Sequence, residues 1–154
     1  MPMRTGTPLP SLDGATEWLN GEACPEDLVG RPVLVHFWAV SCHICHDSMP
    51  TVNRWREEYG PKGLRFVAVH MPRQEIDTDV LRVRQQIVEF GITQPCAIDN
   101  DHRLTEAFEN QNRFVPAYYL FDREGKMRSR AAGDAGTAML EAAIKRQFEA
   151  EAPG

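Results

Sequence analysis

Two cysteines separate a continuous apolar run from a helical pattern near residue 42. Residues 33–39 are almost continuously apolar, which is typical of a strand buried on both faces of a sheet. Cys42 and Cys45 follow that run, and apolar side chains then recur at helical spacing through Met49 and Val52. The sequence therefore predicts a buried strand that turns directly into a helix at a Cys-X-X-Cys motif.

The position of the two cysteines predicts reactive thiols. A cysteine at a helix N-terminus feels the positive end of the helix dipole, so the pKa of Cys42 should fall below the free value of about 8.5. Cys45, one turn further along, can close a disulfide with it. We expect Cys42, toward solvent, to be the attacking thiolate and Cys45, shielded, to be the resolving cysteine. The chemistry indicated is reversible two-electron thiol–disulfide exchange.

His43 lies between the two cysteines, and two interpretations of it stand. As an imidazolium it would stabilise the Cys42 thiolate and make the pair more oxidising. Alternatively its side chain simply points into solvent.

Strand and helix patterns alternate along the rest of the chain. Parallel β-α-β units follow from that alternation, and a turn at residues 123–125 predicts a final hairpin. We expect an α/β fold with a mixed central sheet and helices on both faces. The predicted strands cover residues 17–21 (a short edge strand), 32–39, 64–70, 96–99, 117–122 and 126–131; the predicted helices cover 25–30 (one turn), 43–59, 79–90, 101–109 and 137–148.

Three local signals refine those helices. Pro50 lies inside the helix that follows Cys45 and should kink it. Thr78 is the expected N-cap of the next helix, and Gly91 its C-cap.

Length and charge narrow the class of protein. A chain of 154 residues is most simply a single domain, 1–154, in which the Pro/Gly/Thr-rich residues 1–15 form an N-terminal arm. A net charge of −5 argues against a nucleic-acid or anionic-membrane partner. Since the sequence has neither a run of eighteen apolar residues nor an apolar leader after Met1, we expect a cytoplasmic protein without a membrane span.

The cysteine pair also fits two other kinds of site. Cys42 to His46 also fits the Cys-X-X-Cys-His signature of c-type haem attachment, which would require export and an accessible chain. Cys42, Cys45 and His46 could instead bind zinc, but structural zinc sites have four ligands, and the remaining cysteines, Cys24 and Cys96, are isolated in sequence. We therefore expect no metal site.

Four further residues carry weaker signals. Cys96 lies in an apolar strand and should be a buried free thiol, whereas Cys24 lies in a polar turn. His36 lies inside the first buried strand, either as a hydrogen-bonded core residue or as a group that moves the Cys45 proton. Glu75 is either an acid/base near the disulfide or an ordinary surface charge.

The combined motifs resemble the thioredoxin superfamily, and within it the TlpA/ResA-like thiol–disulfide oxidoreductases, most closely the small soluble YkuV-type proteins of bacilli. The resemblance covers roughly residues 8–150. It is carried by residues 37–45 (FWAVSCHIC), by Pro50 and by residues 115–121 (VPAYYLF). It implies a thioredoxin-like fold with an inserted strand–helix element at residues 94–101, and a cis peptide bond at Pro116 facing the disulfide.

The resemblance also implies how the protein works. Cys42 and Cys45 would reduce disulfides of protein substrates without a cofactor, and an upstream thiol reductant would recharge them. Val115 and Pro116 would hold the substrate backbone, and Trp38 would pack under the active-site loop. The alternative within this chemistry is a disulfide oxidase or isomerase.

Several positions depart from the thioredoxin pattern. His36 stands where thioredoxins bury an acidic residue, Ser41 replaces the tryptophan before the first cysteine, and His-Ile replaces Gly-Pro between the cysteines. Val35 and Ala39 occupy places where peroxiredoxins need a proline and a threonine or serine, which argues against a peroxidase.

Overall fold

The computed structural model of the chain describes residues 2–110 and 112–149. Met1, Gln111 and residues 150–154, which belong to the expected domain 1–154, lie outside the described residues. None of the helices in the described ranges is long and apolar enough to cross a membrane.

The centre of the molecule is a six-stranded mixed sheet in the order β1-β4-β3-β2-β5-β6. Strands β2, β3 and β4 run parallel, and the β1–β4, β2–β5 and β5–β6 pairs are antiparallel. The mixed sheet expected from the alternating pattern is therefore confirmed. The strands are β1 (Glu17–Leu19), β2 (Val33–Trp38), β3 (Arg65–His70), β4 (Cys96–Ile98), β5 (Ala117–Phe121) and β6 (Met127–Ala132).

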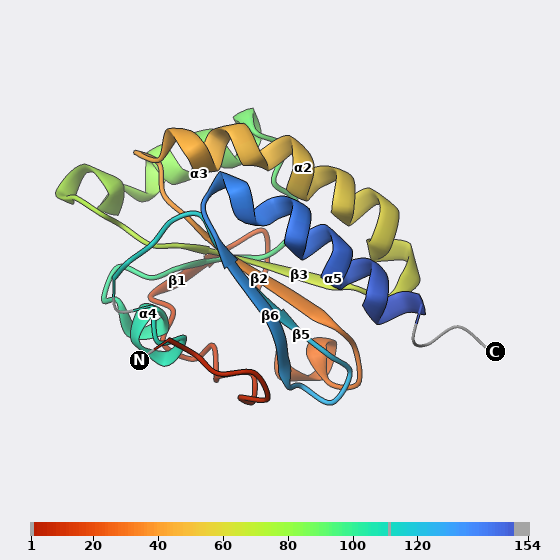
Figure 1. Cartoon of the computed structure of the whole chain (residues 1–154). Coiled ribbons are helices and arrows are strands. Elements are labelled where there is room, and N and C mark those ends of the chain that lie inside the picture. Colours follow the sequence, from red (N-terminus) through yellow and green to blue (C-terminus); the bar gives the residue numbers. More distant parts are fainter. Residues whose placement is uncertain (1, 111, 150–154) are drawn as a thin grey trace.

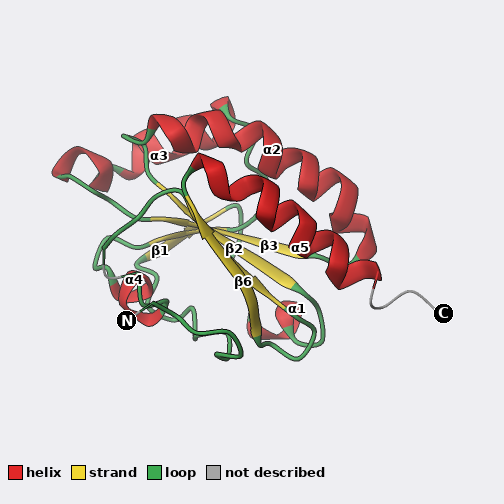
Figure 2. Ribbon diagram, viewed as in Figure 1, coloured by secondary structure: helices red, strands yellow, loops and turns green. Residues whose placement is uncertain are grey.

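Helices cover both faces of this sheet, as predicted (Figures 1 and 2). Three long helices lie on the upper face in the figures: α2 (His43–Tyr59), α3 (Val80–Glu89) and α5 (Thr137–Glu149). Two short helices lie below the sheet: α1 (Pro25–Leu28) and α4 (Arg103–Ala107). The predicted strand–helix element corresponds to β4 and α4, although its helix begins after the range 94–101.

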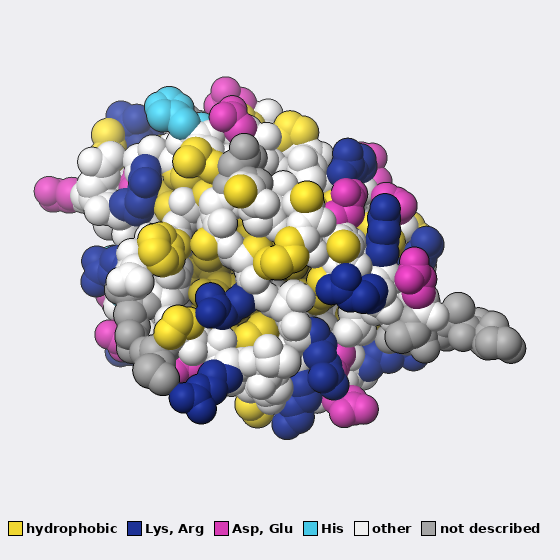
Figure 3. Space-filling model, in the orientation of Figure 1, with side chains coloured by type: hydrophobic (Ala, Val, Ile, Leu, Met, Phe, Trp, Pro, Cys, Tyr) yellow, Lys and Arg dark blue, Asp and Glu magenta, His cyan; other side chains and the backbone are white. Residues whose placement is uncertain are grey.

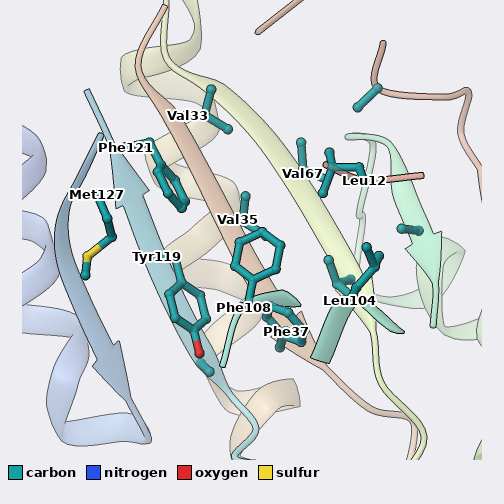
Figure 4. Packing of buried hydrophobic residues seen from close by; sticks show 14 of the residues in the cluster. Leu12, Val33, Val35, Phe37, Val67, Leu104, Phe108, Tyr119, Phe121 and Met127 are labelled. Atoms are coloured by element: carbon teal, nitrogen blue, oxygen red, sulfur yellow. The ribbon is translucent and has the colours of Figure 1, made fainter. Parts of the chain in front are cut away.

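Alternation along β2 supplies the hydrophobic core on both sides. Val33, Val35 and Phe37 point to the lower face, where Phe108 and Tyr119 pack against them (Figure 4). Side chains of the alternate β2 residues are buried on the upper face under the long helices. Burial on both faces explains why this strand reads as a continuous apolar run.

Two helix starts differ from the sequence-based prediction. Asp79, not Thr78, is the N-cap of α3, because its carboxylate accepts a hydrogen bond from the Leu81 N–H while the Thr78 hydroxyl donates to the Glu75 carbonyl of the 3₁₀ turn η2 (Glu75–Thr78). Helix α4 starts at residue 103 rather than 101. Buried Asp99 sets that start by accepting hydrogen bonds from the first turn of α4.

Pro50 lies inside α2, and a kink at that position stays a prediction. Helix α2 continues through Pro50 to Tyr59. Phe90, not Gly91, is the C-cap of α3. Gly91 follows Phe90 with a positive φ of 69°, the backbone conformation that favours glycine just after a helix end.

Candidate active site

Cys42 and Cys45 form a disulfide at the start of α2. Cys42 is the N-cap residue of this helix, and the Cα atoms of the two cysteines lie 5.2 Å apart. The Cys42 Sγ accepts a hydrogen bond of 3.1 Å from the Cys45 backbone N–H. Unpaired N–H groups of a first helical turn stabilise a negative charge, so a thiolate formed at Cys42 Sγ would be stabilised in the same place.

Both cysteines are buried in this oxidised structure, with 3% of Cys42 and 1% of Cys45 exposed. The expectation that Cys42 faces solvent is therefore wrong for the disulfide form. The reason is packing: both cysteines belong to an apolar cluster with Trp38 and Met49. The partly buried side chain of Val115 also packs against that cluster.

The segment before β5 lies against the disulfide cluster. The peptide bond between Val115 and Pro116 is cis, as the resemblance implied. The Pro116 carbonyl accepts a hydrogen bond from Gly133 N–H at 2.9 Å, which ties this segment to the end of β6. The pairing of β2 with β5 thus brings Val115 close to the N-terminus of α2, although Cys42 and Val115 are more than seventy positions apart in the sequence.

Asp77, which the sequence did not single out, is the acidic residue that contacts the active-site loop, and Glu75 is a surface charge. Glu75 is exposed in η2, whereas Asp77, two residues later, is fully buried and accepts a 2.8 Å hydrogen bond from the Ser41 hydroxyl. Ser41 directly precedes Cys42, so Asp77 contacts the active-site loop. An acidic residue shortly after a strand that runs parallel to β2 was the available signal, but its burial depends on the 3₁₀ turn, which the sequence did not reveal.

The two histidines of the motif differ in environment. His43 is exposed, and its ring meets that of His46 edge-on at 6.0 Å. The His46 Nε2 is 2.8 Å from the Gln86 Oε1, and the ring stacks on Phe90 with 4.5 Å between centroids. His46 is thus engaged in holding α2 to α3.

His36 is a hydrogen-bonded core histidine. Its Nε2 lies 2.8 Å from the Gln94 Nε2, and because an amide nitrogen only donates, His36 accepts at that atom. The Gln94 Oε1 in turn accepts from Arg56 at 2.6 Å. Burial, followed by the charge of Arg56, lowers the pKa of His36 to about 3. His36 is therefore neutral in the folded protein at ordinary pH.

The remaining cysteines are poorly suited to react. Cys96 is fully buried, as expected, and burial raises the pKa of its thiol to about 12. The pKa of Cys24 is also raised, by desolvation and by the negative charges of Glu22 and Asp27. In the described part of the chain, no group of three or more His, Cys, Asp or Glu side chains is placed to hold a metal ion.

The amino-acid sequence of the chain matches a known protein family and known relatives. Residues 6–144 match the Redoxin family. The chain belongs to this family. The redoxin is 48% identical over 145 residues to the thiol–disulfide oxidoreductase YkuV of Bacillus subtilis (strain 168), which covers 94% of this chain and 96% of YkuV. It is 26% identical to the thiol–disulfide oxidoreductase ResA of Bacillus anthracis, over 79% of this chain and 66% of ResA.

A solved structure agrees with the fold. A thioredoxin-like protein in its oxidised form, studied in solution, superposes with a TM-score of 0.85 at 47% identity, over 96% of this redoxin and 98% of that chain. The thioredoxin-like fold and the resemblance to YkuV-type and ResA-like proteins are confirmed. This redoxin is a thiol–disulfide oxidoreductase, and Cys42–Cys45 is its Cys-X-X-Cys disulfide.

Proposed function

We propose that this redoxin reduces disulfide bonds of protein substrates, with Cys42 as the nucleophile and Cys45 as the resolving cysteine. The observation that carries the proposal is the position of the Cys42 Sγ at the N-terminus of α2, where it accepts the Cys45 N–H. A thiolate is stabilised there more than at Cys45, which lies inside the helix.

The Cys42–Cys45 dithiol supplies both electrons for the reduction of one substrate disulfide. In the reduced protein, the Cys42 thiolate attacks one sulfur of a substrate disulfide and the other substrate sulfur leaves as a thiolate. Cys45 then loses its proton and attacks the Cys42 sulfur of the mixed disulfide. The substrate leaves with two reduced sulfurs, and two electrons have passed from the Cys42–Cys45 dithiol. A thiol reductant upstream would return the disulfide to the dithiol.

Exposed apolar side chains in the motif and next to Asp77 and Val115 along the chain support a polypeptide substrate. Ile44, Ile76 and Phe114 are each about half exposed, although large apolar side chains are usually buried. Hydrophobic side chains gather over the middle and left of the face shown in Figure 3, with Lys and Arg between them. Val115 and Pro116 would present backbone to an extended substrate segment, and Trp38 would support the loop from below.

The proposal includes the direction of electron transfer and the cellular compartment in which the protein works. We infer a single domain over residues 1–154 that works in the cytoplasm, a reducing compartment, where Cys24 and Cys96 would stay unpaired as they are in this structure. Exposed His43 beside the nucleophile favours a second candidate, a disulfide oxidase or isomerase, if its positive charge stabilises the thiolate enough.

Two substitutions test the roles in a Cys24→Ser background, which removes the half-buried thiol. Cys42→Ser should abolish reduction of a protein disulfide such as that of insulin. Cys45→Ser should instead accumulate a mixed disulfide between Cys42 and the substrate, visible by mass spectrometry. Full activity of Cys42→Ser, or no adduct with Cys45→Ser, would overturn the assignment.

A redox titration decides whether the protein reduces or oxidises its substrates. Equilibration of the reduced protein with dithiothreitol or glutathione buffers gives the potential of the Cys42–Cys45 couple. A value near or below about −250 mV places the protein with thioredoxin-like reductants, and one above about −180 mV places it with oxidants and isomerases.

A further inference from the structure

The loop that carries Cys42 is held by side chains. The Val40 N–H donates a 3.0 Å hydrogen bond to the His70 Nε2, and the Val40 carbonyl accepts from Gln86 at 3.4 Å. The carbonyl of Ser41 accepts from the Arg73 guanidinium at 2.6 Å. The backbone immediately before the nucleophile is therefore fixed from β3, from the loop after it and from α3.

His70 holds its end of this loop as a neutral acceptor. It is the last residue of β3, is fully buried, and meets Trp38 edge-on with 4.9 Å between ring centroids. Because its Nε2 accepts the Val40 N–H, the proton of the neutral ring is on Nδ1. Burial lowers the pKa of His70 to about 4, against the opposing charge of Asp77, so the ring keeps this acceptor role at neutral pH.

Asp77 holds the other end of the loop. One oxygen, Oδ2, accepts both the Ser41 hydroxyl at 2.8 Å and the Arg73 backbone N–H at 2.9 Å. Among the atoms that the structure describes, the other oxygen, Oδ1, and the His70 Nδ1 are buried without a hydrogen-bond partner. Burying a polar side chain with an unpaired oxygen costs free energy of folding, so a role for Asp77 at the loop would account for its position there.

We propose that His70 and Asp77 are positioning residues that fix Val40 and Ser41, and thereby the orientation of the Cys42 Sγ at the start of α2. The inference rests on the proposed role of Cys42 as nucleophile. Within the described residues, the hydrogen bonds of the two side chains go to Val40, Ser41 and Arg73 rather than to the sulfurs, so each acts through the loop. Loss of either anchor would let the loop shift and move the sulfur away from the N–H groups that stabilise its thiolate.

The experiment compares disruptive and conservative variants in the Cys24→Ser background. The readouts are the rate of Cys42 alkylation by iodoacetamide against pH in the reduced protein, which gives the Cys42 pKa, and the reduction potential. Cys96 does not interfere, because its pKa is raised to about 12. Circular dichroism and thermal unfolding establish that each variant is folded.

We expect His70→Leu and Asp77→Ala, which remove the acceptors, to raise the Cys42 pKa and to slow alkylation at neutral pH by about tenfold or more, since small displacements of reacting groups have effects of this size. His70→Gln should restore most of the rate, because its side-chain oxygen can accept the Val40 N–H. Asp122→Ala is the matched control: Asp122 also accepts backbone N–H groups, but in the β5–β6 turn. It should leave the rate and the potential unchanged.

Two outcomes overturn the inference. One is a folded His70→Leu or Asp77→Ala protein whose alkylation rate stays within about twofold of that of the parent and whose reduction potential does not change. The other is a His70→Gln protein no faster than His70→Leu. If His70→Leu does not fold, Ser41→Ala decides, since it removes only the hydroxyl that Asp77 accepts; an unchanged Cys42 pKa then overturns the proposal. Failure of the nucleophile assignment is distinguished by activity remaining in Cys42→Ser.

Discussion

His36 and His70 are buried to the same extent on neighbouring strands, yet their surroundings differ. Both lie on the upper face of the sheet, with His36 opposite Ala68 and His70 opposite Trp38 in the register of β2 and β3. Each accepts a hydrogen bond at Nε2, and burial lowers the pKa of each, to about 3 for His36 and about 4 for His70. Burial therefore explains their common neutrality.

The donors explain the difference between them. His36 accepts from Gln94, which is held by Arg56 of α2, so this region joins a helix to the segment before β4. His70 accepts from Val40 of the active-site loop. Burial thus sets the charge of a core histidine, whereas its hydrogen-bond partner sets which part of the protein it can influence.

The largest expected effect is on stability in the His36 region. His36→Ala should lower the free energy of unfolding by about 3 kcal/mol, because it leaves a cavity and removes the acceptor of the Gln94 amide. Urea unfolding measures the loss. The Cys42 pKa of the folded protein should not change; a shift as large as that of His70→Leu would end the distinction between the two regions.

Acid should destabilise both regions together. In the unfolded chain a histidine takes up a proton below about pH 6.5, whereas folded His36 and His70 stay neutral until pH 3 to 4. The unfolded state therefore binds more protons, and the free energy of unfolding should fall by about 1.4 kcal/mol per pH unit for each histidine.

Urea unfolding at several pH values measures this slope. His36→Gln, which cannot take up a proton, should remove the share that His36 contributes. An identical slope in His36→Gln and the parent would show that His36 is not neutral by burial.

A smaller effect is expected at the outer end of the His36 network. Arg56→Met removes the guanidinium that donates to Gln94 and to the Gly91 carbonyl, and should cost about 1 kcal/mol, since the site is only partly shielded from solvent. Arg54→Met is the control, because Arg54 pairs with Glu141 at the surface. Equal thermal shifts in the two variants would show that the Gln94 link carries no special stability.

The smallest effect should come from a histidine outside both regions. His43 is exposed beside Cys42, so solvent screens its charge. His43→Gln should lower the reduction potential of the Cys42–Cys45 couple by about 10–30 mV, corresponding to less stabilisation of the thiolate. Titration in glutathione buffers measures this change. An unchanged potential would make His43 a bystander. An increase in the potential would contradict the expectation that His43 stabilises the thiolate.

Local patterns in the sequence predicted most of the fold. Strand β2, helix α2 and the cysteine pair follow from apolar periodicity and motif spacing, which depend on neighbours along the chain. The long-range contacts of the site were not visible in this way. Asp77 reaches Ser41, 36 residues earlier, only because η2 folds back over the end of β3. The same limit explains the wrong expectation for Cys42, because Cys42 is buried in a cluster against which Val115, from the distant segment before β5, also packs.

The N-terminal arm runs along the outer edge of β6. Backbone hydrogen bonds join Gly6 and Thr7 to Met127, and Arg130 donates to the Met3 carbonyl. At the opposite edge, β1 is only three residues long. An unpaired strand edge is a template on which another chain can add and aggregate. One edge of the sheet is thus partly covered and the other is short, which leaves little free strand edge on which another chain could add.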